Sequence, residues 1–121
     1  MILLDTSVWV DHFRFGLSHV HSLLEIGEVL CHPWIVGELA CGHIRNRAEI
    51  ISRLKRLPTA PSLSPEELFS FIEAWKLQGR GIGWVDVHLL ASARLHGIQL
   101  WTMDKNLKKA AYELEVEYVS R

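Results

Sequence analysis

Short apolar runs along the chain predict a set of buried strands. They occupy residues 2–4, 28–31, 98–101 and 116–119. The first and third runs are nearly continuous rather than alternating, which is typical of strands covered on both faces of a sheet. The polar positions between them follow a helical period. The pattern therefore indicates strands separated by helices, as in a domain built around a parallel sheet.

The helices are predicted from their start signals and apolar stripes. Ser64-Pro65-Glu66-Glu67 combines a capping serine, a proline suited to the first helical position and a glutamate that completes a capping box. A second helix is predicted over residues 84–96, with Gly97 as its left-handed stop. Further helices are expected over residues 33–38 and 47–57. We therefore expect one α/β domain over residues 1–121, with ligands bound beyond the carboxyl ends of the strands.

Composition narrows the class of protein. The chain has 121 residues, of which 49% are hydrophobic and 22% charged, so it can bury one core without disulfides. No apolar run approaches a membrane span, the N-terminus does not read as a signal peptide, and two cysteines are too few for a secreted framework. These features favour an intracellular protein. The net charge of −1 argues against a uniformly basic nucleic-acid binder but leaves room for a local patch.

Four acids stand in positions that call for explanation. Asp5 and Asp104 each follow a predicted strand and precede a helix, where the simplest interpretation is helix capping. Asp86 opens a helix that is apolar on most sides, so it is either a first-turn acid or a buried carboxylate that needs a partner. Glu38 shares a helical face with apolar residues, although a half-exposed glutamate in a salt bridge would also fit.

Taken together, these acids lie at two strand ends and on two helices able to pack beside those ends. Clustered carboxylates repel one another unless a cation neutralises them. Mg²⁺ and Mn²⁺ prefer oxygen ligands, and such ions can activate water in phosphodiester cleavage. The pattern therefore predicts a metal-dependent hydrolase of phosphodiesters.

The same residues resemble a known family. Leu4-Asp5-Thr6-Ser7, the helical Glu38, Asp86 ahead of Leu89-Leu90-Ala91, and Leu100-Trp101-Thr102-Met103-Asp104 are similar to the motifs of PIN-domain nucleases, and above all to VapC-type toxins. The resemblance spans essentially the whole chain. It implies a three-layer α/β/α sandwich with a central, mainly parallel sheet, and a cytoplasmic Mg²⁺-dependent endoribonuclease with an antitoxin partner and a tendency to form homodimers.

The resemblance also implies roles for particular residues. Asp5, Glu38, Asp86 and Asp104 would form the catalytic and metal-binding site. Thr6 or Ser7 and Thr102 would supply supporting hydroxyls. Asn106 stands where family members often carry another acid, so it offers a neutral oxygen at best and puts a tightly held second metal in doubt.

Basic side chains suggest where RNA would bind. Lys105, Lys108 and Lys109 follow Asp104, and Arg80 lies between two glycines ahead of Asp86. On a helix, Arg45, Arg53 and Arg56 would share one face, although an ordinary solvated face explains them equally well.

Aromatic residues allow a second kind of contact. Trp34, Trp84 and Trp101 flank the acidic motifs and could stack on bases, but core packing is expected for most of the five tryptophans. His88 lies two residues beyond Asp86 and is expected to point elsewhere. Trp9 and Phe13 form an apolar feature near the N-terminus, where VapC-like proteins grip the antitoxin.

Other classes of protein fit less well. A haloacid dehalogenase-type phosphatase would carry a second aspartate where this chain has Ser7, and a receiver domain distributes its acids differently. Two alternatives stay open: a PIN-fold binding module that is catalytically slow, and a housekeeping RNA-processing nuclease. All four acids are present, which favours an enzyme, and the small size favours a toxin.

Overall fold

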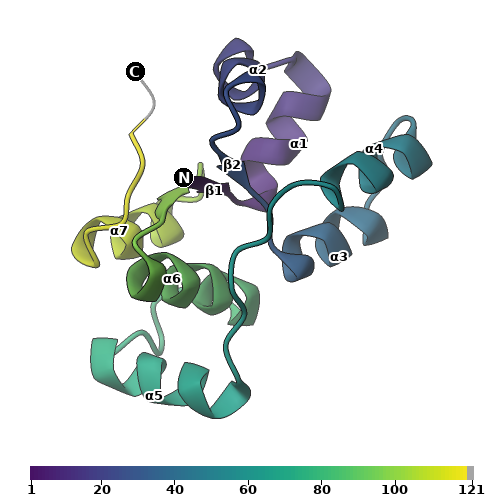
Figure 1. The fold of residues 1–121 in the computed structure, drawn as a ribbon. Helices are drawn as coiled ribbons and strands as arrows, with labels where there is room; N and C mark the ends of the chain where they lie inside the picture. The colour runs from purple at the N-terminus through teal and green to yellow at the C-terminus, as the bar shows by residue number, and fades with distance from the viewer. Residues whose placement is uncertain (120–121) are drawn as a thin grey trace.

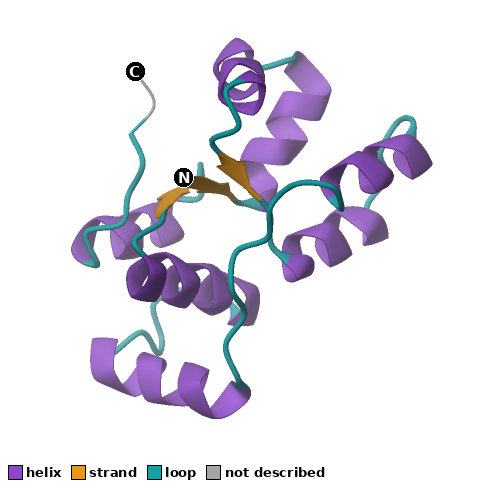
Figure 2. Cartoon of the chain, in the orientation of Figure 1, coloured by secondary structure: helices purple, strands orange, loops and turns teal. Residues whose placement is uncertain are grey.

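The computed structural model describes residues 1–119 as seven helices packed around a small parallel sheet (Figures 1 and 2). The strands are β1 (Ile2–Leu4), β2 (Val29–Leu30) and β3 (Gln99–Trp101), in the order β2-β1-β3. Leu3 pairs with Leu30 on one side and with Leu100 on the other. Leu3, Leu4 and Leu100 are completely buried, as expected for strands covered on both faces.

The helices cover the sheet in layers. They are α1 (Thr6–Phe15), α2 (Ser18–Glu25), α3 (Pro33–Cys41), α4 (Arg47–Leu54), α5 (Pro65–Trp75), α6 (Trp84–His96) and α7 (Lys105–Glu113). Figure 1 shows α1 and α2 above the sheet, α5 and α6 below it, and α3 and α4 beyond β2. The predicted α/β/α sandwich with a parallel sheet is confirmed.

The local start and stop signals act as predicted. Ser64 and Glu67 form the capping box of α5, with Glu67 N donating to Ser64 Oγ at 3.2 Å. Gly97 ends α6 at a φ of 65°, in the left-handed region. Helix α6 lies between β3 and α5 and also packs on α7, so every residue from Val87 to Ala93 is buried. The apolar character of this helix on most sides is thereby explained.

Two predicted elements differ from the structure. Residues 116–119 do not form a strand: Glu117 makes a single parallel bridge to Leu100, because the segment leaves β3 where the Tyr118 ring packs on Trp101 and its hydroxyl contacts His19. Helix α4 ends at Leu54 rather than residue 57. None of the helices in residues 1–119 has the combined length and apolarity that a membrane span requires.

Candidate active site

Asp5 lies at the carboxyl end of the central strand and is almost completely buried. It caps α1, where Oδ1 accepts a hydrogen bond from Val8 N at 3.3 Å and another from the Ser7 hydroxyl. Oδ2 accepts a hydrogen bond of 2.5 Å from Thr102 Oγ1. Burial raises the pKa of Asp5, and the hydrogen bonds from Ser7, Thr102 and Val8 oppose that rise. Asp5 is therefore a helix cap and a buried titratable group at once.

Two hydroxyls connect the ends of β1 and β3. Ser7 Oγ, besides donating to Asp5, accepts from Met103 N at 3.0 Å. Thr102 Oγ1 donates to Asp5 and accepts from Asp104 N, also at 3.0 Å. The parallel pairing of Leu4 with Trp101 brings these turns side by side. Each hydroxyl thus donates to one segment and accepts from the other.

Asp104 and Asp86 occupy helix N-termini on the same side of the molecule. Asp104 caps α7, with Oδ1 accepting from Leu107 N at 2.9 Å, and is exposed. Asp86 lies in the first turn of α6, where Oδ2 accepts from Gly83 N at 3.0 Å. The capping interpretation is therefore correct for Asp5, Asp104 and Asp86, and it accounts for one oxygen of each carboxylate. For Asp104 and Asp86 the other oxygen has no such role in these bonds.

The electrostatics of Asp86 connect all four acids. Burial raises its pKa, and the negative charges of Asp5, Asp104 and Glu38 raise it further. Glu38 projects from the exposed face of α3, and its Oε1 accepts a hydrogen bond of 2.7 Å from Thr6 Oγ1. The structure thus brings acids from four separate segments close enough for their charges to interact.

The donor atoms suit a hard cation. Carboxylate and hydroxyl oxygens are the ligands that Mg²⁺ prefers, and the mutual repulsion of the acids is what such an ion would relieve. Within residues 1–119, however, no three acidic, histidine or cysteine side chains already stand close enough together to form a complete metal site. Asn106 Nδ2 lies 3.5 Å from Gly81 O, which ties this residue to the loop before α6. The donor chemistry fits a metal ion, and the ligand geometry would be completed on binding.

The predicted RNA-contacting cations differ in their surroundings. Three of them are paired with acids: Arg80 with Glu113 at 2.6 Å, Arg53 with Glu49 at 2.6 Å, and Lys108 with Glu117 at 3.9 Å. Four are exposed and form no ion pair within residues 1–119, namely Arg45, Arg56, Lys105 and Lys109. Arg45 and Arg56 lie outside α4, so the predicted single helical face that joins them to Arg53 is wrong.

An aromatic cluster beside the acids is the main feature that the sequence did not reveal. Core packing holds for Trp9 and Trp101, but Trp34, Trp75 and Trp84 are 45%, 37% and 36% exposed. His88 is buried, with its ring stacked on Trp34 at 4.7 Å and edge-on to Trp84 at 5.2 Å. The four-residue spacing of Trp84 and His88 was the available signal, because such residues share a helical face.

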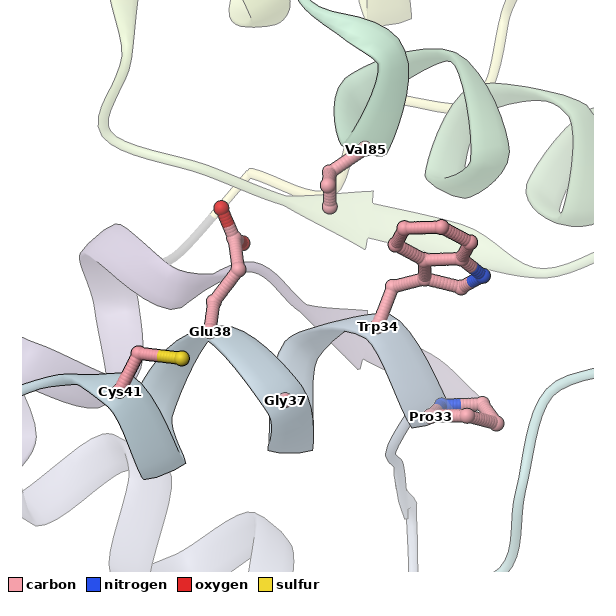
Figure 3. Close-up of a pocket in the computed structure, with 6 residues that line it drawn as sticks. All are labelled: Pro33, Trp34, Gly37, Glu38, Cys41 and Val85. Atoms are coloured by element: carbon pink, nitrogen blue, oxygen red, sulfur yellow. The ribbon is translucent and has the colours of Figure 1, made fainter.

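An open groove lies between α3 and the start of α6 (Figure 3). It has a volume of about 640 Å³ and is lined by Pro33, Trp34, Gly37, Glu38, Cys41 and Val85. Figure 3 shows Trp34 and Glu38 rising from α3 towards Val85. One of the four acids therefore forms part of the wall of an otherwise apolar groove.

Comparison with known proteins identifies this arrangement. The PIN-domain profile matches residues 2–112, which include all four acids. The chain belongs to the PIN-domain family. It is 41% identical over 114 residues to Ribonuclease VapC32 of Mycobacterium tuberculosis, in both strain CDC 1551 / Oshkosh and strain ATCC 25618 / H37Rv, and the match covers 93% of this chain and 92% of the relative. The predicted membership of the PIN-domain family, of the VapC type, is confirmed.

Solved structures of more distant proteins share the PIN fold of this chain. The crystal structure of PAE2754 from Pyrobaculum aerophilum superposes with a TM-score of 0.62 at 13% identity, covering 96% of this chain and 90% of that one. FitAcB from Neisseria gonorrhoeae superposes with a TM-score of 0.60 at 22% identity, covering 93% and 94%. At these identities the likeness concerns the fold.

Proposed function

We propose that this PIN-domain chain is a metal-dependent endoribonuclease, the toxin of a type II toxin–antitoxin pair. The observation that carries the proposal is the electrostatic coupling of Asp86 to Asp5, Glu38 and Asp104, which places the four acids of the family motifs around one point. The similarity to Ribonuclease VapC32 supports RNA as the substrate. We further propose that the protein acts in the cytoplasm.

The four acids would hold Mg²⁺ or Mn²⁺ through their carboxylate oxygens. Such an ion, when bound, lowers the pKa of a water molecule and neutralises charge that develops on the phosphate. The hydroxyls of Ser7 and Thr102 hold the Asp5 carboxylate in place between the two strand ends, and Thr6 does the same for Glu38. Lys105 and Lys109, exposed on the first turns of α7, would attract the RNA backbone.

The remaining charge of the protein agrees with this division of roles. When the four site acids are left out, 13 basic side chains face 10 acidic ones, a balance of +3. The overall charge of −1 is therefore the sum of an acidic pocket and a mildly basic remainder, which suits a protein that binds a cation and a polyanion together.

The activity is tested with purified protein and a panel of structured RNAs. We expect cleavage with Mg²⁺, none with EDTA, and a loss of about a hundredfold or more in Asp5→Asn and Asp104→Asn because each removes a metal ligand. Asp11→Asn, which alters an α1 acid outside the four motifs, is the matched control and should cleave normally. Undiminished cleavage by both site variants would contradict the proposed site. Absence of cleavage by the unaltered protein across the panel would favour a binding module.

We propose an apolar groove between α1, α2 and α4 as the docking site for the antitoxin. It has a volume of about 350 Å³, and Phe13, Leu24, Ile50 and Leu57 lie along it with Arg53 and His12 at its edge. An apolar helix of an acidic antitoxin would fit this combination. A neighbouring gene for a small DNA-binding protein would support the toxin assignment, whereas its absence would favour housekeeping RNA processing. Light scattering would test the proposed homodimer.

A further inference from the structure

The groove between α3 and α6 differs from a surface that would bind phosphate. Among its six lining residues, Glu38 is the only charged one and it is negative, so the wall would repel the RNA backbone and attract no anion. The other lining residues are apolar or nearly so, and Gly37 has no side chain to fill the space beside Trp34. A flat, uncharged group is the part of a nucleic acid that suits these walls.

Trp34 is held in place while much of its indole stays open to solvent. One face packs against His88 at an interplanar angle of 26°, and His88 is itself braced edge-on by Trp84. Burial lowers the pKa of His88, so this ring is neutral near pH 7 and packs as an uncharged aromatic group. Even so, 45% of Trp34 is exposed. A large indole fixed from one side and open on the other has the form of a stacking platform.

The platform adjoins the acids. Trp34 and Glu38 are one helical turn apart on α3, and both face the groove (Figure 3). Val85, on the opposite wall, directly precedes Asp86. Any nucleotide whose phosphate reached the four acids would therefore have its neighbouring base beside the indole.

We propose that this groove is a subsite for an unpaired RNA base next to the cleaved phosphodiester, with the base stacked on Trp34. The subsite rests on the proposed ribonuclease function and deepens it: the preferred substrate has a single-stranded nucleotide at the cleavage point. A base in a duplex is stacked on both faces and cannot occupy the groove without being unpaired.

The test measures RNA binding in EDTA, so that it does not depend on cleavage. The probe is a short single-stranded oligoribonucleotide carrying 2-aminopurine, whose fluorescence is quenched on stacking, beside a matched oligonucleotide with an abasic position. Trp34→Ala should weaken binding of the first oligonucleotide by roughly 5- to 150-fold, the range for losing one stacked base, and should abolish the quenching. Trp34→Phe should keep most of both. Trp75→Ala removes an equally exposed indole outside the groove and should change neither.

A second variant separates binding from folding. A Cβ at Gly37 would meet no atom within 4 Å, and leucine favours helix more than glycine does. Gly37→Leu should therefore leave the fold at least as stable while blocking the groove and weakening binding. Equal affinities of Gly37→Leu, Trp34→Ala and unaltered protein for the oligonucleotide would overturn the subsite.

Further outcomes distinguish this proposal from its neighbours. Equal binding of the abasic oligonucleotide to unaltered protein would also overturn the subsite. A change from dimer to monomer in Trp34→Ala, measured by light scattering, would overturn it in favour of a second protein copy covering the groove. Trp34-dependent binding without Mg²⁺-dependent cleavage would support the subsite and contradict the nuclease function. Cleavage that is indifferent to Trp34 would do the reverse.

Discussion

Replacing Thr102 by valine removes one hydroxyl from the bridge between β1 and β3 and changes little else. Valine has nearly the same shape, and residue 102 is only 5% exposed. The substitution deletes the hydrogen bond to the buried Asp5 carboxylate and leaves Asp104 N without its acceptor at 3.0 Å. Thr102→Val therefore isolates the contribution of this bridge from the packing around it.

The expected loss follows from these two bonds. A hydrogen bond to a charged group contributes about 1.5–3 kcal/mol and a neutral one about 0.5–1.5 kcal/mol. The additional buried methyl group of valine returns about 0.8 kcal/mol. We expect the free energy of unfolding to fall by about 2 kcal/mol at pH 7, which lowers the unfolding temperature of a domain of this size by roughly 6–12 °C.

The pH dependence of this loss tests its cause. The Thr102 hydrogen bond favours the ionised form of Asp5, so its removal raises the already raised pKa of that carboxyl further. The loss of stability should be largest above the folded-state pKa, where Asp5 is charged, and should shrink as the pH falls through that pKa towards the ordinary value of 3.8.

The assay is urea and thermal unfolding followed by tryptophan fluorescence between pH 3.5 and pH 8. Thr59→Val, which makes the same substitution at an exposed position, should change stability by less than about 0.5 kcal/mol. A Thr102→Val protein as stable as the Thr59→Val control at pH 7, or a loss that does not vary with pH, would refute the argument that this hydroxyl stabilises the Asp5 carboxylate.

Three further substitutions have expected outcomes. Asp86→Asn should raise the unfolding temperature at pH 7 in EDTA, because the pKa of Asp86 is raised, so its stability penalty grows as pH rises from 3.8 to the folded pKa and is complete above it; the gain should vanish below pH 3.8, and a gain at every pH would contradict the electrostatic cause. Mg²⁺ should raise the unfolding temperature of the unaltered protein more than that of Asp86→Asn, measured by titration in a thermal shift assay. Gly81→Ala should destabilise by about 1–3 kcal/mol, because φ is +75° and the new Cβ would lie 2.4 Å from Asn106 Nδ2, whereas Gly37→Ala should be neutral or stabilising in the same urea titration.

Much of the fold could be predicted because local signals and burial agree. The continuous apolar run of β1, the capping box at Ser64 and the glycine after α6 each act within a few residues, so the sequence displays them directly. The segment over residues 116–119 was mistaken for a strand because its composition is right for one. Its pairing depends on contacts with His19 and Trp101, which are distant in the sequence.

The candidate site divides in the same way. The acids were visible because a carboxylate at a strand end or on an apolar helix conflicts with its surroundings. That Ser7 and Thr102 both contact Asp5, and that Thr6 contacts Glu38 instead, depends on how β1, β3 and α3 lie relative to one another. The aromatic groove was missed because a tryptophan in a core and a tryptophan on a surface look alike in sequence.

The hydrogen bond between Thr102 and Asp5 joins residues 97 positions apart in a chain of 121. During translation the N-terminal segment leaves the ribosome first, so Asp5 is made at the outset and waits for its partners until the chain is nearly finished. Asp104 and the first turn of α7 are added later still. The acids thus gather only once synthesis is almost over, and a partly made chain carries Asp5 without the site. For a protein proposed to cut RNA, this order of assembly would delay activity until the ribosome is about to release the chain.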